Sequence, residues 1–226
     1  MFKTVLWDID GTLLNFEKAE DKSLEELFEI YGIDFDEQTL EDYKLINRQY
    51  WAKIERHMIE REIALVSRFQ EFFYSKGIMH IDCKKFNDEY QLALGRNFVV
   101  EEGALEICAK LDDMGIVQYA ITNGSKVAQA IKIRKSHLDQ YMRDEFISEE
   151  LGYEKPDTRF FNVVRETTHY NPETTLVVGD GLTSDIRGGN YAGLKCCWYN
   201  PGHLRNNEGV HVDYEIDHLL KLVEII

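Results

Sequence analysis

Apolar and polar residues follow two different patterns along the chain. Near its start, Thr4 to Trp7 is a short apolar run rich in strand-forming residues. Apolar residues then recur at helical spacing from Phe16 to about Asn97, without any proline, which predicts helices over 16–31, 36–60, 63–74 and 86–98. This span has no strand signal of any strength, so we expect a purely helical segment.

The rest of the chain, from residue 103 onward, alternates between short apolar runs and helical patterns. Strands are expected over 116–121, 145–148, 175–178 and 195–199, and helices over 104–114, 126–135, 158–167, 185–192 and 218–225. Such alternation predicts an α/β fold with a parallel-sheet, Rossmann-like core. The core comprises residues 1–15 and 99–226, and a helical cap domain, 16–98, is inserted after the first strand. Because ligands of such sheets bind at the carboxyl ends of the strands, we expect the insertion to act as a lid.

The first strand runs directly into two acids, Asp8 and Asp10, followed by Gly11. Placing two carboxylates at the end of a core strand costs desolvation energy unless a cation or a substrate offsets it. The simpler interpretation is an Asx turn or a helix N-cap, for which one aspartate would suffice. The choice between them depends on what the other strand ends supply.

Three later segments bring further polar groups to the same edge. Thr122, Asn123 and Gly124 follow the second predicted strand, and hydroxyl and amide groups before a helix suit a phosphate, although T-N-G alone usually marks only a turn. Lys155 lies in E-K-P-D before a helix; a lone lysine in a loop is usually just solvated. The stretch G-D-G-L-T-S-D, residues 179–185, follows another strand.

The acids of that last stretch are Asp180 and Asp185, the second of which could serve only as a helix N-cap. With Asp8 and Asp10 they form a cluster of hard oxygen ligands that suits Mg²⁺. A cofactor of this kind would also offset the repulsion between clustered carboxylates and a phosphate.

Composition narrows the partners. A formal net charge of −15 excludes bulk binding to a nucleic acid polymer, which needs a basic face. No apolar stretch approaches membrane-spanning length, and the N-terminus lacks a basic region followed by an apolar run. The four cysteines have no metal-site spacing, which favours reduced thiols in a cytoplasmic protein. The sequence leaves open whether the protein is a monomer or a homodimer.

Taken together, D-I-D-G-T, I-T-N-G, the lysine of E-K-P-D and G-D-G-L-T-S-D resemble, in type and order, the motifs of the haloacid dehalogenase-like hydrolase superfamily. The resemblance covers the whole chain, and the helical insertion occupies the position of that family's first-type cap. Phosphatases of the superfamily carry a second aspartate two residues after the nucleophile, which the dehalogenases lack. Asp10 therefore implies phosphoryl transfer to and from Asp8.

By this resemblance Asp8 is the nucleophile that forms an aspartyl-phosphate, and Asp10 is the general acid and then the base. Thr122, Asn123 and Gly124 are implied to hold the transferring phosphoryl group. Lys155 is implied to bind there too and to offset negative charge. The chain departs from the family pattern at His137-Leu138, away from the motifs, and at Glu154, where small residues are common and an acid could draw on the charge of the lysine.

The resemblance also assigns the metal ligands. Asp8, Asp180 and the backbone carbonyl of Asp10 are implied to bind Mg²⁺, with Asp185 supporting it through the outer shell or a water.

A narrower resemblance concerns the substrate. D-Y-K-L-I-N-R-Q-Y-W, S-R-F and T-S-D-I-R-G-G-N-Y-A-G look like segments of bacterial pyrimidine 5′-nucleotidases, which implies a nucleoside 5′-monophosphate as the small phosphorylated partner. The alternatives are a sugar-phosphate or phosphoglycolate phosphatase, a phosphomutase of the same superfamily, or a non-catalytic binding protein on this fold.

Within the cap, Tyr43, Asn47, Tyr50 and Trp51 recur at helical spacing. They form either packing between cap helices or a face that stacks on a base. Arg68 pairs either with a substrate or with a cap carboxylate.

Overall fold

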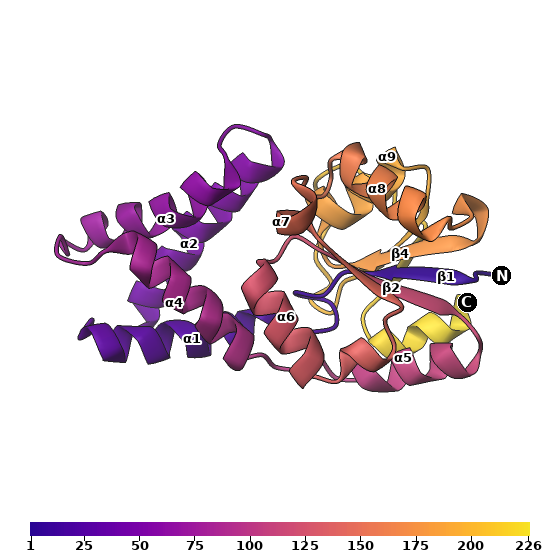
Figure 1. Cartoon of the computed structure of the whole chain (residues 1–226), viewed down its shortest axis with the longest axis horizontal. Helices are drawn as coiled ribbons and strands as arrows, with labels where there is room; N and C mark the ends of the chain where they lie inside the picture. The colour runs from indigo at the N-terminus through magenta and orange to yellow at the C-terminus, as the bar shows by residue number, and fades with distance from the viewer.

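A computed structural model describes all 226 residues, which form a helical unit beside an α/β unit (Figure 1). The helical unit consists of α1 (Phe16–Tyr31), α2 (Glu37–Glu55), α3 (Arg61–Ser75) and α4 (Cys83–Arg96). Both the first strand and everything after residue 100 belong to the α/β unit, so the helical unit is an insertion directly after that strand. No helix is long and apolar enough to cross a bilayer.

The α/β unit is built on one sheet of six parallel strands in the order β3-β2-β1-β4-β5-β6. The strands are β1 (Thr4–Trp7), β2 (Val117–Thr122), β3 (Asp144–Ile147), β4 (Thr175–Gly179), β5 (Lys195–Tyr199) and β6 (Tyr214–Ile216). The order reverses beside β1, because the chain runs outward from β1 to β2 and β3 and then returns to β4 on the other side of β1. Ligands bind at such switch points, and the predicted α/β class is confirmed.

Helices cover both faces of the sheet, with α8 and α9 on one side and α5 on the other (Figure 1). The helices of this unit are α5 (Ala104–Asp113), α6 (Lys126–Lys135), α7 (Ser148–Leu151), α8 (Thr158–Thr168) and α9 (Arg187–Tyr191). Short 3₁₀ turns occupy Leu138–Gln140, Pro172–Thr174 and Leu219–Glu224, and a π turn occupies Leu182–Ile186.

Central strand β1 divides its buried side chains between the two faces, as strand geometry requires. Val5 and Trp7 belong to the apolar cluster that includes Leu111 of α5, whereas Leu6 belongs to the cluster that includes Phe160 of α8. A strand buried on both faces reads as a continuous apolar run. It holds its C-terminal end rigidly in place, and Asp8 is the next residue.

The helical unit has an apolar core of its own, dominated by aromatic rings. The Tyr43 ring stacks on that of Phe69, with centroids 5.1 Å apart, and is fully buried. The core also takes in Ala128 of α6, because α4 packs against α6. The α4–α6 contact therefore joins the helical unit to the α/β unit.

Two chain segments connect the units, and they run beside each other. Leu14 pairs with Val100 in an antiparallel bridge, and the Asn15 amide donates to the Val99 carbonyl at 2.8 Å. The Asn15 side chain also donates to Glu101 at 2.8 Å. The entry and exit of the insertion are thus fastened together at one point next to the strand ends.

Some predicted elements differ from the observed ones. The helix expected over 36–60 ends at Glu55, because His57 adopts a left-handed conformation (φ 54°). This end was not predicted, since the residue in that conformation is a histidine and not a glycine. Strand β6 was not predicted, since three residues are too few to show alternation. The last predicted helix is a 3₁₀ turn, and the one expected at 185–192 begins earlier as the π turn.

Candidate active site

A cavity lies where the carboxyl ends of the strands face the helical unit. Its floor comes from strand ends and the loops after them: Asp8, Asp10, Thr122, Asn123, Gly124, Lys155, Asp180 and Asp185. Its opposite wall comes from the helical unit, through Phe16, Trp51, Glu55, Arg61, Leu65, Arg68, Gln91 and Leu94. All the residues predicted from the strand ends therefore meet around one space.

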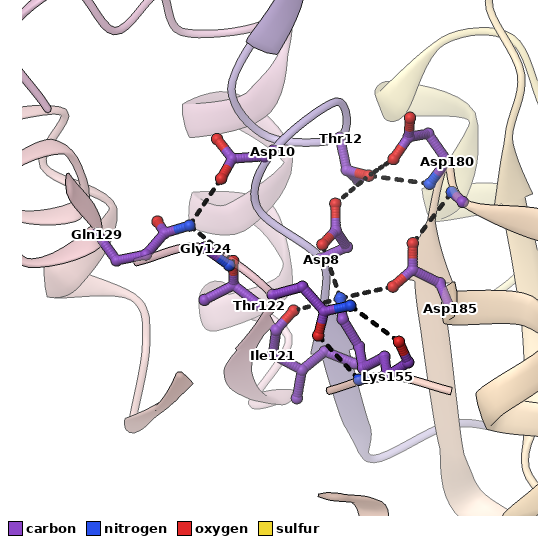
Figure 2. A network of polar contacts seen from close by, with 12 residues as sticks. Asp8, Asp10, Thr12, Ile121, Thr122, Gly124, Gln129, Lys155, Asp180 and Asp185 are labelled. Carbon is purple, nitrogen blue, oxygen red and sulfur yellow. Dashed lines mark hydrogen bonds and ion pairs between the residues drawn. The ribbon is translucent and has the colours of Figure 1, made fainter. Parts of the chain in front are cut away.

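Asp8 stands at the centre of the floor and is almost completely buried (Figure 2). Its Oδ1 accepts a bond from Lys155 Nζ at 2.7 Å, and its Oδ2 accepts one from the Thr12 hydroxyl at 3.0 Å. Lys155 Nζ also donates to Asp185 at 2.6 Å and to the Ile121 carbonyl at 2.8 Å. A lysine ammonium has three N–H donors, and these three bonds use all of them within the protein.

The charges of this group are strongly perturbed. Burial, followed by repulsion from Asp185, raises the pKa of Asp8 to about 7, although the Lys155 charge opposes this. Burial alone would lower the pKa of Lys155, but the Asp185 and Asp8 carboxylates outweigh it and raise that pKa. A lysine shared by two buried carboxylates leaves a net negative charge, which favours the arrival of a cation.

Asp180 completes the carboxylate cluster. Oxygens of Asp8, Asp180 and Asp185 lie within 4.8 Å of one another. Lost hydration, followed by repulsion from Asp8 and Asp185, raises the pKa of Asp180 well above its usual range. Gly11 makes room for this group, because a Cβ there would overlap the Asp180 carboxylate and φ is +95°. Three converging carboxylates with a net negative charge fit a hard divalent cation such as Mg²⁺.

The loop after β2 is locked to Lys155. The Asn123 side chain accepts from the Lys155 amide at 2.8 Å and donates to the Lys155 carbonyl at 2.9 Å. The oxygen and one N–H of its side-chain amide thus hold Lys155, which fixes the orientation of this loop. Thr122 Oγ1 accepts from the Gly124 amide at 3.0 Å and from Gln129 Nε2 at 2.6 Å. The hydroxyl hydrogen of Thr122 is left available as a donor to the cavity.

Asp10 points away from Asp8 and toward α6 (Figure 2). Gln129 Nε2 donates to its Oδ2 at 2.7 Å, and Lys132 Nζ forms an ion pair with its Oδ1. Both partners are buried. They hold the Asp10 side chain apart from the Asp8, Asp180 and Asp185 cluster, so that only its backbone carbonyl remains for a metal. Gln129 joins Asp10 to Thr122 through one amide group.

Replacing Gly124 with alanine tests this arrangement, since a Cβ at Gly124 would overlap the Gln129 amide. We expect Gly124→Ala to displace that amide from Thr122 and Asp10 and to lower turnover about 10-fold, the value of one strong hydrogen bond. The double variant Gly124→Ala/Gln129→Ala relieves the overlap, so it should recover thermal stability without recovering turnover. A double variant with normal turnover would show that the amide does not support the site.

The predicted cap residues have different surroundings. Tyr43 is core, so base stacking is wrong for it, and Tyr50 is buried with its hydroxyl bonded to Glu71 at 2.9 Å. Asn47 is also buried and bonds to Glu20 and Arg68. Trp51 alone of the four lines the cavity and is partly exposed there.

A second arginine of α3 links the two units at the cavity rim. Arg61 Nη1 donates to Glu149 Oε1 at 2.8 Å, and its Nε lies 3.8 Å from Glu154 Oε1. Burial raises the pKa of Glu154, and the Arg61 charge opposes this. Glu154 thus pairs with the helical unit, and the expectation that it draws on Lys155 is wrong.

Sequence reasoning missed several residues that shape the floor: Thr12, Gln129 and Lys132. Thr12 stands inside the D-I-D-G-T motif, so its position next to two acids was the available signal. Gln129 and Lys132 are three residues apart on α6 and therefore share one face. Nothing distinguishes them in the sequence from ordinary polar positions of a surface helix.

Comparison with known proteins places the chain among enzymes. A family model described as haloacid dehalogenase-like hydrolase matches residues 2–193. The chain is 33% identical to the HAD-hydrolase YfnB of Bacillus subtilis, over 100% of this chain and 95% of the relative. A crystal structure of YfnB bound to magnesium superposes with a TM-score of 0.93 at 33% identity, covering 99% of this chain and 98% of that one.

Two further relatives have a named activity. The pyrimidine 5′-nucleotidase PynA of Streptococcus pneumoniae is 34% identical over 95% of this chain and 91% of its own length. The pyrimidine 5′-nucleotidase YjjG of Escherichia coli is 26% identical over 98% of this chain and 96% of its own length.

Proposed function

The chain belongs to the haloacid dehalogenase-like hydrolase family and is a phosphoric monoester hydrolase, and we propose that it is a Mg²⁺-dependent nucleoside 5′-monophosphate phosphatase that prefers pyrimidines. The observation behind this proposal is the meeting of Asp8, Thr122, Lys155 and Asp180 at one cavity whose other wall combines polar side chains with an apolar part. The floor suits a phosphate and a cation, and the wall suits a flat ring. The names of two relatives support the same substrate class.

In the first half of the reaction, a carboxylate oxygen of Asp8 attacks phosphorus. A bond forms between Asp8 and phosphorus as the bond to the nucleoside 5′-oxygen breaks. Lys155 and Thr12 fix the Asp8 carboxylate by hydrogen bonds, so that the nucleophile is oriented before the substrate arrives. Thr122 donates its hydroxyl hydrogen to a phosphoryl oxygen.

Asp10 serves as the general acid and then as the general base. It gives a proton to the departing 5′-oxygen, then takes one from the water that attacks the aspartyl-phosphate, which releases inorganic phosphate and restores Asp8. For this the Asp10 side chain turns from Gln129 and Lys132 toward the reacting atoms. The two α6 residues thus hold Asp10 as a carboxylate beside the cavity between turnovers, and the side chain takes up a proton from solvent once it has left the Lys132 ammonium.

The carboxylates of Asp8 and Asp180 and the backbone carbonyl of Asp10 would hold Mg²⁺, with Asp185 behind them. Bound there, the ion neutralises the carboxylates and the phosphate oxygens, whose mutual repulsion would otherwise oppose binding. Lys155 already balances part of the charge of Asp8 and Asp185, and its donors are spent on these partners. Its contribution to the phosphate is therefore its charge.

The apolar part of the cavity argues for a nucleotide over a small sugar phosphate. It is lined by Phe16, Trp51, Leu65 and Leu94. A triose phosphate is too small to cover these side chains and would leave them exposed to water. A glyceraldehyde 3-phosphate phosphatase of Pyrococcus furiosus is 26% identical to this chain, the same value as YjjG, so the choice between the two substrate classes rests on these apolar side chains. The four cysteines are free thiols, which supports a cytoplasmic location.

Chelation tests the metal requirement. Activity on a chromogenic phosphate ester should fall to background in excess chelator and return with Mg²⁺, whereas Ca²⁺ should restore it poorly because its looser coordination disturbs in-line attack. Asp180→Asn should raise the Mg²⁺ concentration needed for half-maximal rate, and Asp112→Asn, on the exposed side of α5, should leave it unchanged. Full activity in excess chelator would refute the metal assignment.

A substrate panel tests the reaction itself. UMP, CMP, AMP, ribose 5-phosphate and glyceraldehyde 3-phosphate are compared by kcat/KM at saturating Mg²⁺. Highest values for the pyrimidine nucleotides support the proposal. Highest values for a sugar phosphate would contradict the substrate class while leaving the phosphatase chemistry intact.

A further inference from the structure

Arg68 is a buried cation that is not directly bonded to any carboxylate. Its side chain is almost completely enclosed on the inner face of α3, yet it lines the cavity opposite the strand ends. Its hydrogen bonds all go to neutral oxygens, those of Leu65 O at 3.1 Å, Asn47 Oδ1 at 2.7 Å and Asn87 Oδ1 at 3.1 Å. Burying a guanidinium in this way costs desolvation free energy unless other interactions offset it.

The surroundings hold the guanidinium in one orientation. It packs over the Phe69 and Tyr90 rings, 4.9 and 5.2 Å from their centroids. The carboxylate of Glu20 is linked by hydrogen bonds to Arg68 only through Asn47, and it accepts bonds from Asn47 and Tyr90. A guanidinium has five N–H groups, and those beyond the three bonds above have no acceptor in the protein. Arg68 is therefore a preorganised donor at the cavity wall.

The neighbours of Arg68 indicate what it meets. Trp51, Leu65 and Leu94 make this part of the wall apolar. A second phosphate or a carboxylate would have to shed its hydration here, with Glu55 also facing the cavity. A neutral ring with a carbonyl oxygen at its edge meets both features, because its faces are apolar and its oxygen is a strong acceptor.

We propose that Arg68 donates hydrogen bonds to a ring carbonyl oxygen of the pyrimidine base in the leaving nucleoside and is thereby a specificity-determining residue. The inference rests on the proposed nucleotidase function. Uracil and cytosine both carry such an oxygen, whereas adenine has none and would leave the buried donors unpaired. Sites built to bond a polar group discriminate strongly against ligands that lack it.

The test compares substrates with and without a base. Arg68→Met keeps much of the apolar stem and removes the donors. The ratio of kcat/KM for UMP to that for ribose 5-phosphate should fall about 10- to 100-fold, mostly through KM, because the bond is made equally in ground and transition states. Preference for UMP over AMP should shrink by a similar factor. Arg96→Met, an exposed arginine of α4, is the matched control and should change neither ratio.

Three outcomes would overturn the assignment. Equal losses on UMP and ribose 5-phosphate would make Arg68 a structural residue, and an unchanged kcat/KM on both substrates would show that it does not contact the base. A wild-type enzyme that hydrolyses ribose 5-phosphate but no nucleotide would refute the proposed function itself. If Arg68→Met does not fold, Arg68→Lys replaces it: a lysine keeps the charge but not the planar fork, so the UMP ratio should still fall.

Discussion

The Asp8→Asn variant is expected to lose turnover by about 10⁴-fold or more, because an amide cannot form the aspartyl-phosphate. The loss should not come from unfolding. The substituted side chain keeps an acceptor for Lys155 and removes a buried charge that Asp185 repels, a repulsion that helps raise the pKa of Asp8 to about 7. Stability at neutral pH should therefore be equal to that of the wild type or higher.

Steady-state rates on UMP and thermal unfolding measure the two effects separately. Asp112→Asn makes the same chemical change at an exposed position and should alter neither. Turnover of Asp8→Asn within 10-fold of wild type would place the nucleophile elsewhere. A collapse of stability together with activity would show that Asp8 has a structural role that this account does not give it.

Asp10→Asn should lower turnover by about 10²–10⁴-fold, the usual contribution of general acid–base catalysis. Asparagine has nearly the same shape and can still accept from Gln129, but it transfers no proton. Substrate binding should be largely kept. The loss should be smaller in the first step for esters with good leaving groups, because their oxygens need no proton, so the aspartyl-phosphate should accumulate.

Pre-steady-state kinetics with a chromogenic ester reveal this pattern as a burst of product followed by a slow phase. Lys132→Met provides a contrast, since it removes the ion pair that holds Asp10 aside without removing the acid. Its turnover should fall less than that of Asp10→Asn. Near-normal turnover in Asp10→Asn would mean that another group transfers the proton.

Strand ends were the part of the site that could be predicted. Asp8, Thr122 and Asp180 each follow an apolar run, and parallel strands bring their carboxyl ends to one edge. Lys155 was predicted from its motif alone, and its burial between Asp8 and Asp185 follows from the loop geometry. These positions depend on local pattern plus topology, both of which a sequence reveals.

Contacts between elements far apart in the chain could not be predicted. Asp10 and Lys132 meet only because the fold places α6 against the loop after β1, and a lysine at that position of a helix gives no signal by itself. The same holds for Tyr43, whose spacing fits equally a stacking face and a helix core; only the Phe69 ring against it decides for the core. Helical period reports which face a residue occupies but not what faces it.

The partners of Arg68 could not be predicted from the sequence either. Its sequence context allowed pairing with a substrate or with a cap carboxylate, and the hydrogen bonds to Asn47 and Asn87 exclude a direct carboxylate partner. That information resides in the packing of α2, α3 and α4, which no local motif encodes.

Trapping the covalent intermediate tests the central claim most directly. Enzyme mixed with UMP and Mg²⁺ is quenched in acid within the first turnover, digested and analysed by mass spectrometry. We expect one added phosphoryl group on the peptide that contains Asp8, more of it in Asp10→Asn, and none in Asp8→Asn. A phosphoryl group that persists in Asp8→Asn, or its absence from both wild type and Asp10→Asn during turnover, would contradict that claim.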